Sequence, residues 1–330
     1  MQTSHVLPGL LFTLLFVLAG ATPSHAVEAV EITEWRVPWD NSRPRDPWVG
    51  GPGRIWFVGQ VGDYVASLNP KTGEFRRYDL EPGTGPHTVI ADARGAWYAG
   101  NRARHIGLID PHSGVVDKIM MPGDGRGDVH TMDFTSAGDI WFTVQHGNQI
   151  GFLDTETREV TLYPVPTPSA RPYGLVVGKD DRPWVALFGT HKLATVSDGE
   201  VKEFDLPRQD SRPRRLGLDG DGKVWYVDYA AGYLGRYDPR SDKVEEWRTP
   251  AAQHAMPYAM GMDHRGRPWF VETGVQPNRF VGFDPATETF TEPVKIGSGG
   301  GTVRHMVFDA RRQAFWFGTD TNTIGKAALK

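Results

Sequence analysis

The chain of 330 residues contains no cysteine. This absence excludes disulfide bonds and any metal or redox site built from thiolates. The chain also lacks an excess of basic residues, because 36 Lys and Arg stand against 40 Asp and Glu, which gives a net charge of −4. Such a balance does not favour a nucleic acid as the partner. Low-complexity stretches and an internal domain boundary are missing as well.

Long apolar runs are scarce, and the one that stands out lies at the N-terminus. Residues 7–21 are apolar, and Ser24 and Ala26 are small residues at the spacing that a signal peptidase recognises. The run is short for a membrane span. We therefore expect a signal peptide at residues 1–26 and export to the periplasm or the exterior. The mature chain would be a single domain at residues 27–330 without a transmembrane segment.

Tryptophan, by contrast, recurs with a regular period. Seven copies stand 41 to 47 residues apart, each inside a short apolar phrase. They are Trp56, Trp97, Trp141, Trp184, Trp225, Trp269 and Trp316. A period of ~40–45 residues that holds several short strands is typical of a β-propeller with one repeat per blade. The sequence therefore predicts an all-β, seven-bladed propeller, and we expect the seven indoles to pack in its core.

Each repeat predicts four antiparallel strands. After the Trp strand comes an Ile-Gly phrase, then hairpin turn residues, a third strand and a Pro-containing link to the next repeat. The last repeat stops one strand short, whereas residues 30–38 have the pattern of that missing outer strand. We therefore expect the N-terminal strand to complete the last blade and close the ring.

The propeller geometry places candidate ligand-binding residues at one rim of a central funnel. If Trp lies on the second strand from the centre, the start of the first strand and the end of the second share this rim. The residues just before each first strand are predicted to be Trp48, His87, His130, Tyr173, Arg214, Tyr258 and Arg304. They would form a collar of stacking and hydrogen-bonding groups for a bulky ligand with aromatic or amide parts. Packing against neighbouring blades is the alternative.

The loops after the Trp strands contribute a second ring of candidates. Its members are Gln60, Asn101, Gln145, Phe188, Asp228, Glu272 and Asp320. The three acids fall on consecutive blades, and carboxylate oxygens are the ligands that Mg²⁺ and Ca²⁺ prefer. They can equally pair with Arg214, Arg236 or Arg304. His305 lies beside this acidic wall and is a candidate proton acceptor near pH 7.

Three phrases follow one another through blades three and four. They are Trp-Phe-Thr at 141–143, Asn-x-Ile-Gly at 148–151, and a Pro-rich link that ends in Pro-Tyr-Gly at 172–174. This order resembles the virginiamycin B lyase (streptogramin B lyase) family, and the resemblance extends over the whole mature chain. It implies a seven-bladed propeller. It also implies a divalent metal and a β-elimination that opens a cyclic depsipeptide at its threonyl ester.

The resemblance also assigns roles to single positions. A Tyr of the family at the start of blade one corresponds to Trp48, and a substrate-binding His of blade six corresponds to Tyr258. The family's Glu-Pro-His of blade seven, which supplies a metal ligand and the base, corresponds to residues 302–304, Thr-Val-Arg in this chain. The family's second acidic metal ligand corresponds to Asp320, which is also a carboxylate. Because arginine does not accept a proton at ordinary pH, His305 is the remaining candidate for the base.

Three functions stay open on this basis. The first is a metal-assisted carbon–oxygen lyase with Glu272, Asp320 and Asp228 as ligands of Mg²⁺ or another divalent cation and His305 as base. The second is a non-catalytic periplasmic propeller that binds or senses a ligand through the collar residues. The third is a metal-dependent lactonase. In each case we expect a monomer with a small-molecule or peptide-like ligand in the central funnel.

Overall fold

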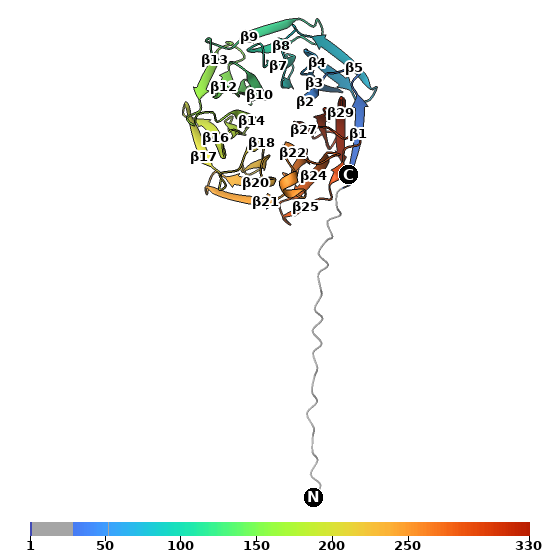
Figure 1. The fold of residues 1–330 in the computed structure, drawn as a ribbon, viewed down its shortest axis with the longest axis vertical. Helices are drawn as coiled ribbons and strands as arrows, with labels where there is room; N and C mark the ends of the chain where they lie inside the picture. Colours follow the sequence, from blue (N-terminus) through green and yellow to red (C-terminus); the bar gives the residue numbers. More distant parts are fainter. Residues whose placement is uncertain (2–28, 52) are drawn as a thin grey trace.

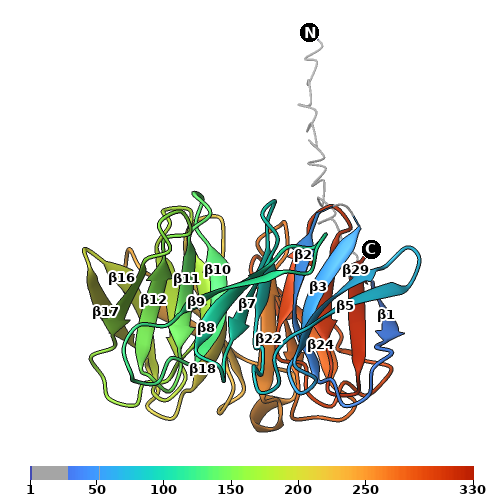
Figure 2. The ribbon, with the colours of Figure 1, turned by 90° about the horizontal axis from the view of Figure 1, so that it is seen from above.

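The structure, a computed structural model, describes residues 1, 29–51 and 53–330. Its strands form seven sheets that surround a central axis (Figure 1). Seen from the side, the strands of each blade run between the two faces of the ring (Figure 2). Apart from Met1, the expected signal segment 1–26 lies outside the described residues. Within the described ranges, no helix combines the length and the apolar character needed to cross a membrane.

Blades one to three each contain four antiparallel strands, ordered from the axis outwards. Blade one consists of β2 (Pro44–Gly50), β3 (Arg54–Gly59), β4 (Tyr64–Asn69) and β5 (Glu74–Asp79). Blade two consists of β6 (Val89–Ala91), β7 (Ala96–Gly100), β8 (His105–Ile109) and β9 (Val116–Met120). Blade three consists of β10 (Val129–Phe134), β11 (Ile140–Val144), β12 (Gln149–Leu153) and β13 (Val160–Pro164).

Blades four to six follow the same order, with one departure at the outer edge of blade six. Blade four consists of β14 (Pro172–Val177), β15 (Pro183–Leu187), β16 (Lys192–Ser197) and β17 (Glu200–Asp205). Blade five consists of β18 (Pro213–Leu218), β19 (Val224–Asp228), β20 (Tyr233–Asp238) and β21 (Lys243–Arg248), and the short 3-10 helix η1 (Ala252–His254) follows it. Blade six consists of β22 (Pro257–Met262), β23 (Pro268–Glu272), β24 (Arg279–Asp284), β25 (Thr289–Phe290) and β26 (Val294–Lys295). Both β25 and β26 pair with β24. Pro293, which lies between them, has no N–H to donate to the ladder, and the outer strand is interrupted there.

Blade seven joins the two ends of the described chain, as expected from the sequence. Its strands are β27 (Met306–Asp309), β28 (Ala314–Gly318), β29 (Thr323–Leu329) and β1 (Val30–Arg36). The antiparallel register of β1 and β29 runs from the pair Val30 and Leu329 to the pair Arg36 and Thr323. The ring of Trp35 lies 5.5 Å from that of Trp316. The N-terminal strand is therefore both paired and packed, which closes the ring.

The repeated Ile-Gly phrase has a steric cause. In blades two, three, five and seven, the aromatic residue that follows the blade tryptophan lies directly across from the glycine of the neighbouring strand. A Cβ atom at Gly151 would lie 2.1 Å from the ring of Phe142, and one at Gly235 would lie 2.0 Å from Tyr226. Any side chain at these positions would displace the ring. The aromatic residue after the tryptophan and the glycine of the Ile-Gly phrase thus pack against each other.

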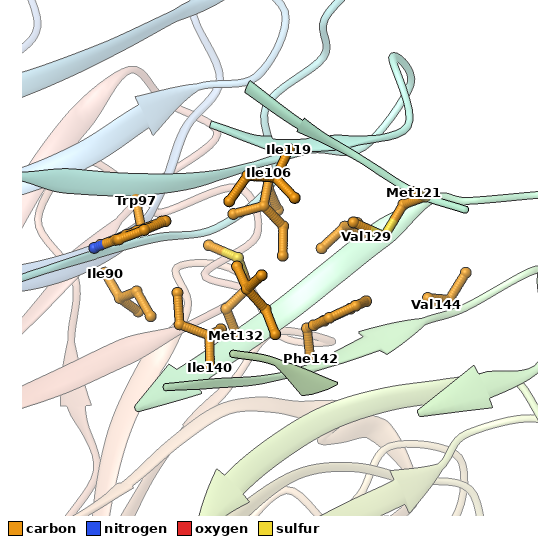
Figure 3. Close-up of a cluster of buried hydrophobic side chains, with 12 residues drawn as sticks. Ile90, Trp97, Ile106, Ile119, Met121, Val129, Met132, Ile140, Phe142 and Val144 are labelled. Carbon is orange, nitrogen blue, oxygen red and sulfur yellow. The ribbon is translucent and has the colours of Figure 1, made fainter. Parts of the chain in front are cut away.

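The core consists of packing between blades. The seven repeat tryptophans are at most 8 % exposed, which confirms their expected role in the core. Buried apolar side chains of the described chain form seven clusters, one at each interface between neighbouring blades. Figure 3 shows the cluster between blades two and three, where Trp97 and Ile106 lie near Met132 and Phe142. Truncating one large buried side chain of this kind typically costs ~3–5 kcal/mol.

Candidate functional site

Seven residues, one from each blade, stand at or just before the start of the inner strands, next to the central axis. They are Arg45, His87, His130, Tyr173, Arg214, Tyr258 and Arg304, and we call them the axial residues. On five of the described blades a β-bulge follows this position, as between Pro172 and Leu175. A bulge bends the strand and re-aims its side chains. This local feature turns the axial residues away from the sheet and towards the axis.

In blade one the axial position is held by a residue other than the predicted Trp48. Pro44 pairs with Gly59 as Pro172 pairs with Leu187, so the axial residue is Arg45. Trp48 lies further along β2, where its Nε1 donates to the carbonyl of Ala91 at 3.0 Å and its ring contacts Phe134. It therefore packs between blades and is no part of the collar.

The sequence contained the signal that identifies Arg45. Pro44 stands twelve residues before Trp56, just as Pro172 stands twelve before Trp184. The Pro-aromatic pair at 47–48 drew the prediction to the wrong proline.

The aromatic axial residues stack on one another and are almost completely buried. The ring centroids of His87 and His130 lie 3.5 Å apart, and those of His130 and Tyr173 lie 4.1 Å apart. The hydroxyl of Tyr173 on blade four hydrogen-bonds to that of Tyr258 on blade six. All four side chains are at most 5 % exposed. The structure thus brings the four predicted aromatic residues together in one continuous group.

Asp46, which the sequence analysis did not single out, is the anionic centre of the axis. Its carboxylate accepts hydrogen bonds from Arg45 Nε, Arg215 Nη2 and Thr88 Oγ1, each at 3.0 Å. Burial raises the pKa of Asp46, but the charges of Arg45 and Arg215 outweigh burial and hold this pKa far below its usual range. The carboxylate therefore stays ionised throughout the ordinary pH range.

Arg215 links the opposite sides of the ring. Besides Asp46, it donates from Nη1 to the hydroxyl of Thr131 at 3.1 Å and from Nε to the carbonyl of Arg304 at 3.1 Å. One buried guanidinium on blade five thereby holds side chains or backbone from blades one, three and seven. We call Arg45, Asp46, Thr88, Thr131 and Arg215 the axial network.

The two axial histidines are neutral. Burial lowers the pKa of His87 and of His130 well below the ordinary value, and the charge of Arg215 lowers both further. Their Nδ1 atoms lie 3.2 and 3.0 Å from the hydroxyls of Thr88 and Thr131. Because a neutral imidazole carries no charge to repel a neighbour, the two rings can stack within van der Waals distance beside several arginines.

His305 lies beside the axial network rather than against the acidic rim. Burial and the charge of Arg215 lower its pKa to about 3, although Asp46 opposes the shift. Its buried Nδ1 has no hydrogen-bond partner among the described residues. A group with so low a pKa is neutral at pH 7, but it is a weak proton acceptor, because general bases work best with a pKa near the operating pH.

The three predicted metal ligands are each bound by an arginine of their own neighbourhood. Asp228 accepts from Arg208 Nη2 at 2.5 Å, and it also accepts the backbone N–H groups of residues 212, 230 and 231. Glu272 accepts from Arg279 Nε at 2.8 Å. Asp320 pairs with Arg304. The ion-pair alternative is thus the one found, although only Arg304 among the three expected arginines takes part.

Arg214 lies within a ring of aromatic side chains at the rim. Its guanidinium carbon is 3.6 Å from the ring centroid of Tyr258, 4.2 Å from Tyr229, 4.5 Å from Phe188 and 4.9 Å from Tyr173. Phe188 and Tyr229 are only half-buried. A cation over several π faces is attracted by each of them. Phe188, Tyr229 and Arg214 are the members of this group that are partly exposed to solvent.

The arrangement defines a class of protein. It is a seven-bladed β-propeller whose axis is closed by arginine, histidine and tyrosine side chains, with the rim loops held by ion pairs. The chain belongs to the virginiamycin B lyase family, whose model matches residues 30–327. The members of this family are carbon–oxygen lyases that generally use a divalent metal.

Three relatives show how far the similarity extends. A virginiamycin B lyase from Nocardia farcinica is 27% identical over 210 residues, which cover 52% of this chain and 73% of that protein. A streptogramin B lyase structure matches with a TM-score of 0.82 at 21% identity and covers 91% of this chain and 98% of its own. A catalytically inactive virginiamycin B lyase from Staphylococcus aureus with quinupristin matches with a TM-score of 0.83 at 22% identity, over 92% of this chain and all 100% of that chain. At these identities the two solved structures establish the fold.

The residues of this chain do not fit the family's divalent metal. Across residues 29–51 and 53–330, no group of three or more His, Asp and Glu side chains is arranged to hold a metal ion. Where the family has Glu-Pro-His, Thr302 offers a neutral hydroxyl and Arg304 offers a positive charge. The guanidinium of Arg304 is bound to Asp320, which corresponds to an acidic metal ligand of the family. A divalent cation would have to displace an arginine from each carboxylate that it recruits.

Proposed function

We propose that this chain is a ligand-binding propeller of the virginiamycin B lyase family, which holds a small-molecule or peptide-like ligand at the rim without metal-assisted β-elimination. The observation that carries this proposal is the ion pair of Arg304 and Asp320. It places a cation on the acid that the family's pattern would give to the metal. The half-buried rings of Phe188 and Tyr229 offer stacking surface for the ligand.

The chemistry of elimination explains why this site favours binding. The reaction needs a base for the threonyl Cα proton and a cation for the enolate-like charge. Arg304 cannot accept a proton, and His305 is a weak acceptor because its pKa is lowered to about 3. Losing a general base typically removes ~10²–10⁴-fold of rate. The residues present therefore support binding better than turnover.

A carbon–oxygen lyase is the second candidate, favoured by the family match over residues 30–327. The axial group best suited to serve as its base is Tyr173. Burial raises the pKa of Tyr173, but Arg214, Arg45 and Arg215 lower it to about 8. This value is closer to neutrality than that of His305.

One incubation with a group B streptogramin and Mg²⁺ distinguishes the binding function from the lyase function. Ring opening by elimination leaves the mass of the compound unchanged, so the product is followed by chromatography and fragmentation. We expect the cyclic compound to stay intact and to raise the melting temperature of the protein. Linear product that forms only with Mg²⁺ would contradict the proposal. In that event, Tyr173→Phe and His305→Gln would identify the base, with Tyr163→Phe on the outer strand of blade three as the matched control.

We also propose that the chain acts as an exported monomer. Support comes from the apolar run at residues 7–21 and the small residues Ser24 and Ala26. N-terminal sequencing of the protein from the cell envelope should begin at Val27. A protein that retains Met1 in the cytoplasm would contradict export, and a dimer in sedimentation analysis would contradict the monomer.

A further inference from the structure

Positive charge is in excess at the centre of the ring. Four arginines lie at or beside the axis, namely Arg45, Arg214, Arg215 and Arg304, while the acids there are Asp46 and Asp320. The neighbouring histidines His87 and His130 do not change this balance, because their lowered pKa keeps them neutral. Buried charges in proteins are generally paired or bound to a counter-ion. The two carboxylates leave part of the arginine charge uncompensated.

Two of the four arginines have donors to spare. Arg45 is 4 % exposed; its Nε and Nη1 are bound to Asp46 and Gln60, whereas its buried Nη2 has no partner among the described residues. Arg214 donates from Nη2 to the Tyr173 hydroxyl at 3.3 Å, and its buried Nε is likewise unpartnered. Arg215, in contrast, uses all three of its nitrogens within the axial network.

Arg214 is joined to the pair of axial tyrosines: its Nη2 donates to the Tyr173 hydroxyl, which hydrogen-bonds to the Tyr258 hydroxyl. Both Arg45 and Arg214 lie close enough to the hydroxyls of Tyr173 and Tyr258 for their charges to act on these groups. Burial raises the pKa of Tyr173, but the charges of Arg214, Arg45 and Arg215 outweigh burial and lower it. The half-buried rings of Phe188 and Tyr229 flank Arg214 on the solvent side. An anionic group attached to an aromatic body would meet cations below and ring faces around it.

We propose that Arg45 and Arg214, together with the hydroxyls of Tyr173 and Tyr258, form a binding site for the carboxylate of an aromatic ligand. A planar guanidinium matches a planar carboxylate with parallel hydrogen bonds. The aromatic side chains that surround Arg214 suit an aryl carboxylate. This inference rests on the proposed binding function and specifies the chemistry of its ligand.

Thermal denaturation with simple probes tests the site. Benzoate at millimolar concentration should raise the melting temperature above that in chloride of equal ionic strength, while benzamide, its neutral counterpart of the same shape, should not. Inorganic phosphate tests whether any anion suffices, and an equal shift with phosphate would overturn the aryl carboxylate assignment. Arg214→Gln should weaken benzoate binding by about 10-fold or more, since it removes a charged donor.

A matched control separates the site from general charge. Arg182→Gln removes an arginine from an exposed turn, where it pairs with Asp180, and should leave benzoate binding unchanged. Arg45→Gln disturbs the pair with Asp46, so Arg214→Gln is the decisive variant. Equal losses in Arg182→Gln and Arg214→Gln, or equal shifts with benzamide and benzoate, would overturn the site. Benzoate binding that persists while a streptogramin is linearised would instead overturn the proposed function and leave the carboxylate site standing.

Discussion

The axis and the rim use the same residue types but pair them over different distances. At the axis, Asp46 binds Arg215, which is 169 positions away in the sequence and on the other side of the ring. At the rim, Glu272 binds Arg279, seven positions away on the neighbouring strand of the same blade. The rim pair can form within a single blade. The axial pair can form only when the ring is closed.

The axial pair of Arg215 and Asp46 is also more buried than the rim pair of Arg304 and Asp320, whereas the rim carboxylates of Glu272 and Asp228 are as buried as that of Asp46. The side chains of Arg215 and Asp46 are 3% and 0% exposed, whereas those of Arg304 and Asp320 are 18% and 27% exposed. Removing one partner of a buried pair leaves an uncompensated charge and is costly, while a solvated pair contributes little. Closure of the ring therefore depends on the axis, whereas the pair of Arg304 and Asp320 mainly fixes a rim loop. This difference predicts the order of the effects below.

The largest effect should come from opening the ring. Deleting residues 27–38 removes β1 together with the packing of Trp35 on Trp316. Loss of a paired strand, of the half-buried Trp35 and of the buried Val37 should cost at least ~3–5 kcal/mol, and the axial network should separate as the blades part. Thermal denaturation of the deletion variant beside a chain that begins at Val27 measures this. An unchanged melting temperature would show that β1 does not close the ring.

Breaking the axial network itself should be the next largest effect. Asp46 has a φ of 45°, a left-handed conformation that Asn also adopts readily. Asp46→Asn therefore removes the charge and leaves the backbone unstrained. Arg45 and Arg215 then lose their common anion, and we expect a loss of ~3–5 kcal/mol in the free energy of unfolding. Urea denaturation gives this value, and a loss below that of a rim substitution would contradict the comparison.

The neutral histidines should make the protein sensitive to mild acid. The pKa of His305 is lowered from 6.5 to about 3, so the unfolded chain takes up the proton first as the pH falls. This contribution to stability is complete above pH 6.5 and decreases from there towards pH 3. His87 and His130 are shifted in the same direction. Each such group lowers the free energy of unfolding by up to ~1.4 kcal/mol per pH unit within this window.

Urea midpoints between pH 5 and pH 7 measure this sensitivity. His305→Gln should make the decrease with pH shallower. His112→Gln, on an exposed turn, is the matched control and should leave the slope as it is. A wild-type stability that is flat down to pH 5 would mean that the central histidines are not buried in neutral form.

The smallest effect should come from the rim. Asp320→Asn breaks the partly exposed pair with Arg304, and we expect a loss of only ~0.2–1 kcal/mol. The released Arg304 adds to the positive charge at the rim, so benzoate binding should be kept or strengthened. Urea denaturation and the benzoate-induced thermal shift test both statements. A loss as large as that of Asp46→Asn would remove the distinction between axis and rim.

The sequence predicted what is local or repeated. The spacing of the tryptophans indicated seven blades, the strand pattern at residues 30–38 indicated the closure, and both are confirmed. The collar positions His130, Tyr173 and Tyr258 followed from their places at the start of inner strands. In blade one the same reasoning chose the wrong residue. Two prolines, Pro44 and Pro47, stand there, and the prediction started from Pro47 instead of Pro44.

The partners across the ring could not be read from the sequence. Which side chain meets Asp46 depends on the diameter and closure of seven blades, and no local pattern encodes the pairing of positions 46 and 215. At the rim, by contrast, the partners of Glu272 and Asp228 lie close in the sequence and were still not recognised. Three acids on successive blades resembled a metal site. However, the hairpin of β23 and β24 places Arg279 beside Glu272, and the link before β18 places Arg208 beside Asp228. Charge alone did not show that these acids were already neutralised.

Binding of Mn²⁺ tests most directly the central claim that arginine charge has replaced the metal at this site. Calorimetry should detect no stoichiometric Mn²⁺ binding to the wild-type chain at millimolar concentration. Thr302→Glu combined with Arg304→His releases Asp320 and restores the family's donor types, so this double variant should bind one ion per chain. Stoichiometric binding by the wild type that is lost in Asp320→Asn would contradict the account.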